Sequence, residues 1–360
     1  MPVSLKALLS DVILQNASDL HVGVGVPPMM RIDGTLRNVE GVGIPTGLDI
    51  ERALLEVMHK DRLEAFKEEN ELDFSFSYTG PDGIEARFRG NCFHEAHGVA
   101  AAFRLFPANI RSVEELYLPV VLKDVVRKRR GLFLVTGPTG HGKSTTLAAL
   151  INEINATRSD HIITIEDPIE YVHRSKQCLI HQREIGTDTA SFAEGLRRAL
   201  RQDPDVILIG ELRDLETIAA AVTAAETGHL VLGTLHTQDA AQSLDRLIDV
   251  FPPHQQQQIR VQLASVLLGI CSQQLIPRGE LGGRVCATEL LLANPAVRNC
   301  IREGKSSQIR TLIQTGANIG MHTMEQKLAE FVRDGRLPLD AALAYAYDPQ
   351  DLQRILAKSV

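Results

Sequence analysis

A glycine-rich loop between a strand-like run and a helix-like segment constrains this 360-residue chain more than any other feature. The run GLFLV (131–135) is short, apolar and partly β-branched, and residues 147–154 carry Leu and Ile at helical spacing. Between them, TGPTGHGKSTT (136–146) contains GxxxxGK[ST] without a departure. Because the order is strand, loop, helix, the sequence predicts a phosphate-binding P-loop.

Each position of this loop has a chemical role. The glycines allow the backbone to turn and bring its N–H groups close to phosphate oxygens at a helix N-terminus. Lys143 is expected to reach the β and γ phosphates of ATP, and the Ser144 hydroxyl to join the shell of a Mg²⁺ ion. The residues expected to contact the nucleotide are Gly137, Pro138, Thr139, Gly140, His141, Gly142, Lys143, Ser144 and Thr145.

Composition narrows the class of protein. The chain is 44% hydrophobic with a net charge of −7, so it is an ordinary globular chain without the positive charge of a nucleic-acid binder, and no nucleic-acid partner is expected. The basic cluster RKRR (127–130) is interpreted as a solvated helix end. Five cysteines lack metal-binding spacing, and neither a targeting segment nor a membrane-length apolar run is visible. We therefore expect a cytoplasmic protein.

Residues 1–106 are predicted to form a small α/β domain with a mixed sheet covered by helices on one side. A charged helix is expected over 48–70, and strand-like runs follow at 72–78, 84–93 and 98–106. Asp33-Gly34 and GPDG (80–83) are turn signals.

A segment with prolines at both ends, 107–119, is interpreted as a linker, and 120–293 as the nucleotide-binding core. Apolar strand-like runs at 131–135, 161–167, 205–211 and 229–237 alternate with helical stretches, which predicts a parallel sheet covered on both faces. From Pro253 the pattern is helical apart from one strand-like run at 283–293, so 294–360 are expected to be a helical C-terminal region.

Two of the apolar runs end in carboxylates. Glu211 follows VILIG and is interpreted as the Walker B carboxylate that acts on Mg²⁺ directly or through its water, because ligands bind at the carboxyl ends of parallel strands. Glu166 ends IITI and is the candidate general base that activates water. Asp167 is the alternative base. A structural role, in which both acids cap the turn at Pro168, is the alternative to catalysis.

Two histidines flank the last of these runs, in TGHLVLGTLHT (227–237). His229 and His236 are seven residues apart, so on one straight strand they point to opposite faces. Either is a candidate sensor of the γ-phosphate, and a structural role is the alternative for each. His229 is the one we include among the candidate catalytic residues.

Taken in order, the P-loop, ITIEDPIE (163–170), DPDVILIGELRDLETI (203–218) and the histidine segment resemble the secretion ATPase superfamily, which powers type II and type IV secretion and type IV pili. This resemblance implies an N-terminal PAS-like domain, a RecA-like P-loop ATPase domain and a homo-hexameric ring. It also implies attachment to the cytoplasmic side of an inner-membrane pilus machine, with a platform protein, and with a paralogous ATPase as a further partner.

A decapeptide, AVRNCIREGK (296–305), resembles the AIRNLIRE signature of pilus retraction ATPases. It departs from that string at Val297 and Cys300, both apolar and both expected on the buried face of a helix. Pilus assembly ATPases usually carry a longer N-terminal region and a cysteine-rich zinc insertion, which this sequence lacks. The resemblance therefore favours retraction, and an ATPase of a secretion or DNA-transfer system is the alternative. A third hypothesis, a regulator that binds nucleotide without hydrolysing it, is disfavoured because Glu166 and Glu211 are present.

The family also directs arginines of its N-terminal domain at the nucleotide phosphates. The matching motifs ARFRGN (86–91) and AAFRLF (101–106) assign this role to Arg89 and Arg104. The alternative is two ordinary strand arginines that face solvent.

Overall fold

The computed structural model describes residues 3–32, 34–80, 83, 85–106 and 109–358. They form two compact units: the first comprises residues up to 109 together with 168–172, and the second comprises 110–167 and everything from 173 onward. Both units combine helices and sheet, which confirms the α/β class. Asp33, residues 81–82 of the GPDG turn and residues 107–108 of the expected linker lie outside the described residues.

A six-stranded sheet in the order β3-β2-β1-β6-β5-β4 forms the centre of the first unit. Every neighbouring pair is antiparallel, so the expectation of a mixed sheet was wrong. Short connections explain four of these pairs, because a parallel pair needs a crossover of a dozen residues or more. The fifth pair, β1 with β6, is antiparallel although four strands and two helices separate its members in the sequence. The strands are β1 Asp19–Val22, β2 Met29–Ile32, β3 Thr35–Asn38, β4 Glu71–Thr79, β5 Glu85–Glu95 and β6 Gly98–Phe106.

Three helices share one apolar core with this sheet: α1 Leu5–Leu14, α2 Gly47–Leu54 and α3 Lys60–Glu69. The single helix expected over 48–70 is thus two helices. In a continuous helix of about 3.6 residues per turn, Leu63 would lie about half a turn away from Leu54. The break lets both side chains reach the same core, where both are buried.

A seven-stranded sheet in the order β13-β12-β7-β11-β10-β8-β9 runs through the second unit. All its pairs are parallel except β12 with β13, which confirms the parallel sheet. The strands are β7 Gly131–Thr136, β8 His161–Glu166, β9 Leu179–Glu184, β10 Val206–Ile209, β11 Leu230–Leu235, β12 Leu267–Pro277 and β13 Arg284–Leu292.

Strand β12 corrects the expectation of helix from Pro253 onward. Residues Pro253–Val266 form helix α9 as expected, but the next eleven residues pair with β7 on one side and β13 on the other. An apolar run such as LLGIC fits a buried strand or a buried helix equally well, and here the free edge of β7 selects the strand.

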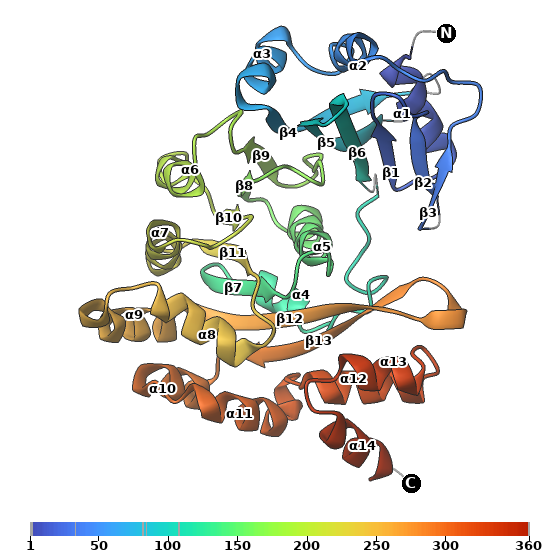
Figure 1. The fold of residues 1–360 in the computed structure, drawn as a ribbon. Helices are drawn as coiled ribbons and strands as arrows, with labels where there is room; N and C mark the ends of the chain where they lie inside the picture. The colour runs from blue at the N-terminus through green and yellow to red at the C-terminus, as the bar shows by residue number, and fades with distance from the viewer. Residues whose placement is uncertain (1–2, 33, 81–82, 84, 107–108, 359–360) are drawn as a thin grey trace. The chain divides into compact units, whose positions relative to one another are not determined.

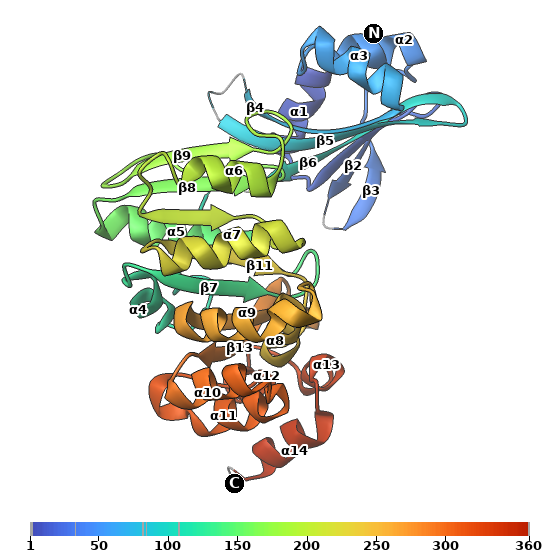
Figure 2. The ribbon, with the colours of Figure 1, turned by 90° about the vertical axis from the view of Figure 1, so that its left-hand side faces the viewer.

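Helices cover both faces of this sheet (Figures 1 and 2). On one face α4 Leu122–Val126 and α5 Lys143–Thr157 pack with Val113, Leu116 and Leu118 of the expected linker. On the other face lie α6 Phe192–Ala199, α7 Leu215–Glu226, α8 Ala240–Asp249 and α9. Burial on two faces explains why these strands read as continuous apolar runs.

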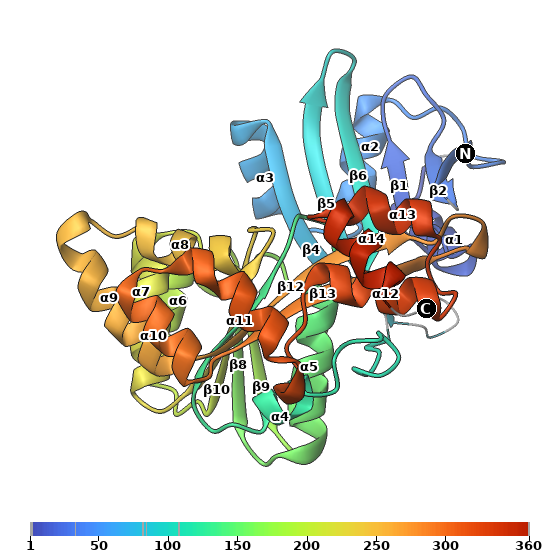
Figure 3. The same cartoon turned by 90° about the horizontal axis from the view of Figure 1, so that it is seen from below.

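The C-terminal helices are α10 Pro295–Glu303, α11 Ile309–Thr315, α12 Met324–Arg333, α13 Leu339–Tyr345 and α14 Pro349–Ala357. Figure 3 shows them across β12 and β13. Met324, Leu328 and Phe331 of α12 share an apolar cluster with Ile276 and Val285 of these strands. Within the described part of the chain, no helix has both the length and the apolar composition needed to cross a bilayer.

The carboxyl group of Glu289 on β13 is buried in this region, at 4% exposure. Burial raises its pKa to about 7 from an ordinary 4.5; Asp239 and Glu325 add to the rise, and the Ala240 N–H and Arg310 oppose it. Between these pH values the folded chain therefore holds a proton that the unfolded chain has lost.

We expect Glu289→Gln to stabilise the fold above pH 7. In the wild-type chain the free energy of unfolding falls by about 3 kcal/mol as pH rises through this window, and the glutamine avoids that loss. Denaturant unfolding of both proteins at pH 5 and pH 8 measures this difference. The free energy of unfolding of the variant, relative to that of the wild type, should increase with pH. A difference that does not depend on pH would contradict the buried protonated carboxyl.

Candidate nucleotide site

The predicted P-loop joins β7 to α5 and is shaped by glycines in conformations that L side chains rarely adopt. Gly137, Gly140 and Gly142 have φ of 142°, 79° and 83°. Gly137 is the most confined of the three, because a Cβ there would lie 2.3 Å from the carbonyl oxygen of Gln273, whereas a Cβ at Gly142 would lie 3.3 Å from the Gln273 side chain. The first glycine of the motif is therefore required by the neighbouring strand β12 as well as by the turn.

We expect Gly137→Ala to abolish nucleotide binding and to lower stability, because the methyl group displaces either the loop or β12. Gly140→Ala is the matched control, since it shares the positive φ but meets nothing within 4 Å. Binding of a fluorescent ATP analogue, with thermal unfolding beside it, separates the two variants. Equal losses of binding and stability in the two variants would mean that the positive φ alone excludes alanine and that the contact with β12 has no effect.

Lys143 begins α5 and lies inside the loop, with only 8% of its surface exposed. Its ammonium donates to the carbonyl oxygens of Gly137 at 2.7 Å and Pro138 at 3.0 Å. Ser144 follows in the first turn of α5, beside backbone N–H groups that have no partner within the helix. The loop thus gathers a cation, a hydroxyl and the positive end of a helix dipole, which is the chemistry that binds a polyphosphate.

Gln273 on β12 supports the loop and was missed by sequence analysis, which expected helix there. Its amide accepts a hydrogen bond from Thr146 Oγ1 at 2.8 Å and donates to the His141 carbonyl at 2.6 Å. His141 Nδ1 in turn accepts from the Leu275 N–H at 3.2 Å. These contacts fix the loop against a strand more than 120 residues away, so no local sequence signal reveals them.

Glu211 follows β10, and His236 follows β11, at the edge of the sheet that carries the loop. His236 Nε2 lies 3.2 Å from Glu211 Oε1, and His236 Nδ1 lies 3.1 Å from Thr139 Oγ1. Burial, Lys143 and Arg213 lower the pKa of His236, and Glu211 opposes this shift. A neutral imidazole that donates from Nε2 to the Glu211 carboxylate accepts from the Thr139 hydroxyl at Nδ1, so it links the P-loop to Glu211.

Of the two histidines, the structure places His236 beside the P-loop and His229 at the other end of β11. His229 stands before β11, and its carbonyl accepts a hydrogen bond from the N–H of Gly131, the first residue of β7. Its Nδ1 lies 2.9 Å from the Ala224 carbonyl, at the end of α7. The loop follows the other end of β7, so within this unit a whole strand length separates His229 from it.

Glu166 ends β8, and its carboxylate is held in place. Oε1 accepts hydrogen bonds from Thr164 Oγ1 at 2.6 Å and from Gln182 Nε2 at 3.2 Å. Gln182 lies on β9, a strand that sequence analysis did not predict. Because β8 and β10 are parallel neighbours, Glu166 and Glu211 end at the same edge of the sheet. Asp167 follows directly and acts electrostatically on Arg213, which also contacts Glu211.

In the first unit, Arg89 and Arg104 lie directly opposite each other on β5 and β6. Like charges at such a position destabilise a sheet, yet each has its own carboxylate: Arg89 lies 3.3 Å from Asp73 and Arg104 lies 2.8 Å from Asp19. Burial acts to raise the pKa of Asp19, but hydrogen bonds from Ser18 and Arg104 lower it below its usual value. The two neighbouring guanidinium groups are therefore stabilised by one carboxylate each, Asp73 and Asp19.

Comparisons with known proteins agree with this geometry. A family model described as "Type II/IV secretion system protein" matches residues 2–343. The chain belongs to this family.

The pilus retraction ATPase PilT of Pseudomonas aeruginosa is 46% identical over 97% of this chain and all of its own length. A twitching motility protein of Neisseria gonorrhoeae is 45% identical over 97% of this chain and 92% of its own. A crystal structure of the retraction motor PilT with bound ADP superposes with a TM-score of 0.89, at 44% identity, and covers 98% of this chain and 99% of that one. Within the type II/IV secretion family, the chain is thus a PilT-like, nucleotide-binding ATPase.

The retraction signature of this secretion ATPase forms α10. Val297 and Cys300, where the sequence departs from the signature, are both buried, as expected. Arg298 donates hydrogen bonds to three carbonyls at the end of α9, those of Ala264, Ser265 at 2.9 Å and Leu267 at 3.0 Å. It therefore joins α10 to the end of α9 and the start of β12.

We expect Arg298→Ala to destabilise the chain by about 2–3 kcal/mol, because the last carbonyls of α9 lose their charged donor. Glu303→Gln is the control in the same helix, since that carboxylate is exposed and bonds only the neighbouring Asn299 and Lys305 among the contacts described. Denaturant unfolding compares them. If Arg298→Ala unfolds like the wild type, the arginine is free to contact a partner instead.

Proposed function

We propose that this chain is the ATP-driven motor that retracts type IV pili and so powers twitching motility. The observation that carries the proposal is the end-to-end match to a pilus retraction ATPase, which extends beyond the P-loop region to the signature helix α10. A shared P-loop alone would support any nucleotide-binding function. An ATPase of a secretion or DNA-transfer system remains the alternative, because it would use the same nucleotide site.

In this proposal the nucleotide site works as follows. The loop amides and Lys143 bind the ATP phosphates. Ser144, and Glu211 directly or through a water, would provide oxygen ligands for Mg²⁺ beside those of the phosphates, and the ion would supply charge neutralisation. Glu166, oriented by Thr164 and Gln182, accepts a proton from the attacking water. His236 links Glu211 to the P-loop and senses the state of the γ-phosphate.

Assembly and partners form the second part of the proposal. The chain works as a homo-hexamer in which Arg89 and Arg104 add positive charge at the phosphates, so that hydrolysis depends on domain closure. The ring acts at the cytoplasmic face of the inner membrane on a platform protein of the pilus machine, together with a paralogous retraction ATPase where one exists. What supports this is the resemblance of the chain to retraction ATPases and the paired arginines of β5 and β6.

Deletion of the gene, with complementation, tests the proposed function. The deletion strain should carry more surface pili than the parent and should not twitch. The wild-type chain should restore the normal number of pili and the motility, and Lys143→Ala should restore neither. Purified wild-type chain should hydrolyse ATP, and excess chelator should stop turnover. Normal pili and motility in the deletion strain, together with a defect in protein export or DNA transfer, would favour the alternative system.

A further inference from the structure

The segment Gln238–Ala240 connects His236 to helix α8, and side chains from two other parts of the second unit hold it. The Ala240 N–H donates to Glu289 Oε1 on β13 at 3.0 Å. The Gln238 carbonyl accepts a hydrogen bond from the phenol of Tyr347, which lies between α13 and α14. Tyr347 is thus separated from its partner by 109 residues of chain, yet it reaches a position only two residues from His236.

The side chain of Gln274 on β12 also acts on this phenol: burial raises the pKa of Tyr347, and Gln274 opposes the rise. Gln274 is the neighbour of Gln273, which supports the P-loop from β12. Tyr347 therefore contacts the segment that follows His236 and lies beside Gln274 of β12, the strand that brings Gln273 to the P-loop. Because Tyr347 lies in the short connection between α13 and α14, it links these helices physically to the site.

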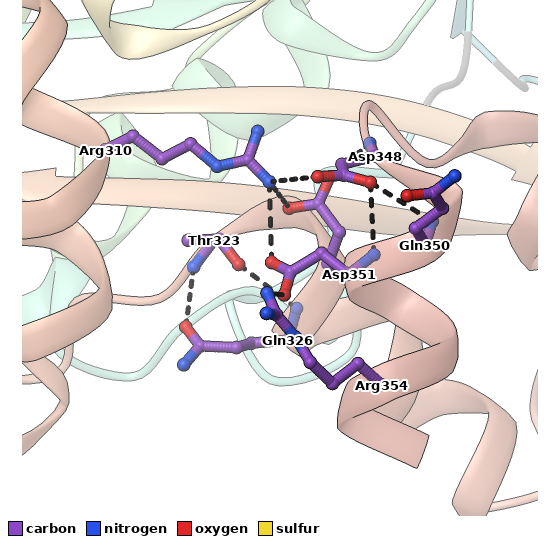
Figure 4. A network of polar contacts seen from close by, with 8 residues as sticks. Arg310, Thr323, Gln326, Asp348, Gln350, Asp351 and Arg354 are labelled. Atoms are coloured by element: carbon purple, nitrogen blue, oxygen red, sulfur yellow. Dashed lines mark hydrogen bonds and ion pairs between the residues drawn. The ribbon is translucent and has the colours of Figure 1, made fainter. Parts of the chain in front are cut away.

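Tyr347 is itself anchored by a network of charged groups, shown in Figure 4. Arg310 Nη2 lies 3.2 Å from the fully buried Glu325 and 3.5 Å from Asp351, while Arg354 binds the other oxygen of Asp351 at 2.5 Å. The N–H of Asp348, the residue after Tyr347, donates to Glu325 at 2.9 Å. A buried carboxylate with these partners holds a fixed position, because losing one of them leaves a charge without compensation.

We propose that Tyr347 is a positioning residue for hydrolysis: by holding the Gln238 carbonyl, it keeps His236 against Thr139 and Glu211. This rests on the proposed ATPase function and adds a link through which the C-terminal helices control the nucleotide site. Movement of α12–α14 would pull on the Tyr347 contact and shift His236, and nucleotide-dependent movement of His236 would reach the same helices.

Removal of one oxygen atom tests the proposal. In Tyr347→Phe, backbone hydrogen exchange across residues 236–243 should become faster, and kcat should fall roughly three- to tenfold with little change in KM, the effect of one hydrogen bond that acts on orientation. Tyr345→Phe is the matched control: it removes a phenol oxygen two residues earlier from α13, where the ring packs on the apolar cluster of the C-terminal helices. It should leave both quantities unchanged.

A double-mutant comparison then identifies the route. In a His236→Ala background, measured under single-turnover conditions with enzyme in excess, Tyr347→Phe should have no further effect, since the histidine it positions is absent. Unchanged exchange or unchanged kcat in Tyr347→Phe would overturn the proposal, and so would an equal loss in both backgrounds. If wild-type chain did not hydrolyse ATP, the proposed function would fail, while the exchange measurement would still decide whether Tyr347 holds the segment.

Discussion

Glu166→Gln should lower ATP turnover by roughly a hundredfold or more while leaving ATP binding close to wild type, the loss expected when a general base is removed. The glutamine has nearly the same shape and keeps an oxygen that accepts from Thr164 and Gln182, so the site should stay in place. What disappears is the proton acceptor. Steady-state turnover and binding of a fluorescent ATP analogue measure the two properties separately.

Asp167→Asn is the matched control, because it makes the same chemical change one residue further along. We expect a much smaller loss of turnover in this variant. A large loss there, with Glu166→Gln close to wild type, would transfer the base role to Asp167. Weakened ATP binding in Glu166→Gln would instead mean that this carboxylate shapes the site rather than the reaction.

Arg89→Ala and Arg104→Ala should each reduce turnover by about a thousandfold or more, the scale of an arginine that stabilises a transferring phosphoryl group. ATP affinity should fall much less, because the P-loop, Lys143 and Ser144 remain. Stability should change little for Arg89, whose partner Asp73 is exposed, and more for Arg104, whose partner Asp19 is mostly buried. Turnover, nucleotide binding and unfolding of each variant test these three expectations.

Two further substitutions keep this prediction sharp. Lysine at either position should rescue only part of the turnover, since a point charge lacks the planar fork of guanidinium. Arg37→Ala removes an exposed arginine from β3 of the same sheet and should have no effect. If the alanine variants at 89 and 104 also hydrolyse ATP at the wild-type rate, these are ordinary strand arginines and hydrolysis does not depend on them.

Much of the nucleotide site was predictable because its parts are local in sequence. A P-loop is one continuous stretch whose glycines, lysine and hydroxyl are read directly, and the structure places it between β7 and α5 as predicted. The positions of Glu166 and Glu211 were predictable for a related reason: apolar runs that alternate with helices form parallel strands, and the carboxyl ends of such strands meet at one edge. No knowledge of the strand order was needed.

Other parts depended on contacts that pattern alone does not contain. The run 267–277 carries an apolar stretch that suits strand or helix, and only the free edge of β7 made it the strand that brings Gln273 to the P-loop. The choice between two histidines depended on which one follows β11, because only that end of the strand meets the loop, and it favoured His236. The phenol of Tyr347 reached this segment across 109 residues. The sequence by itself determined the chemistry of the site, because that chemistry depends on residue types and short spacings. The tertiary structure decided which distant side chains hold those residues in place, because their positions depend on strand order and packing.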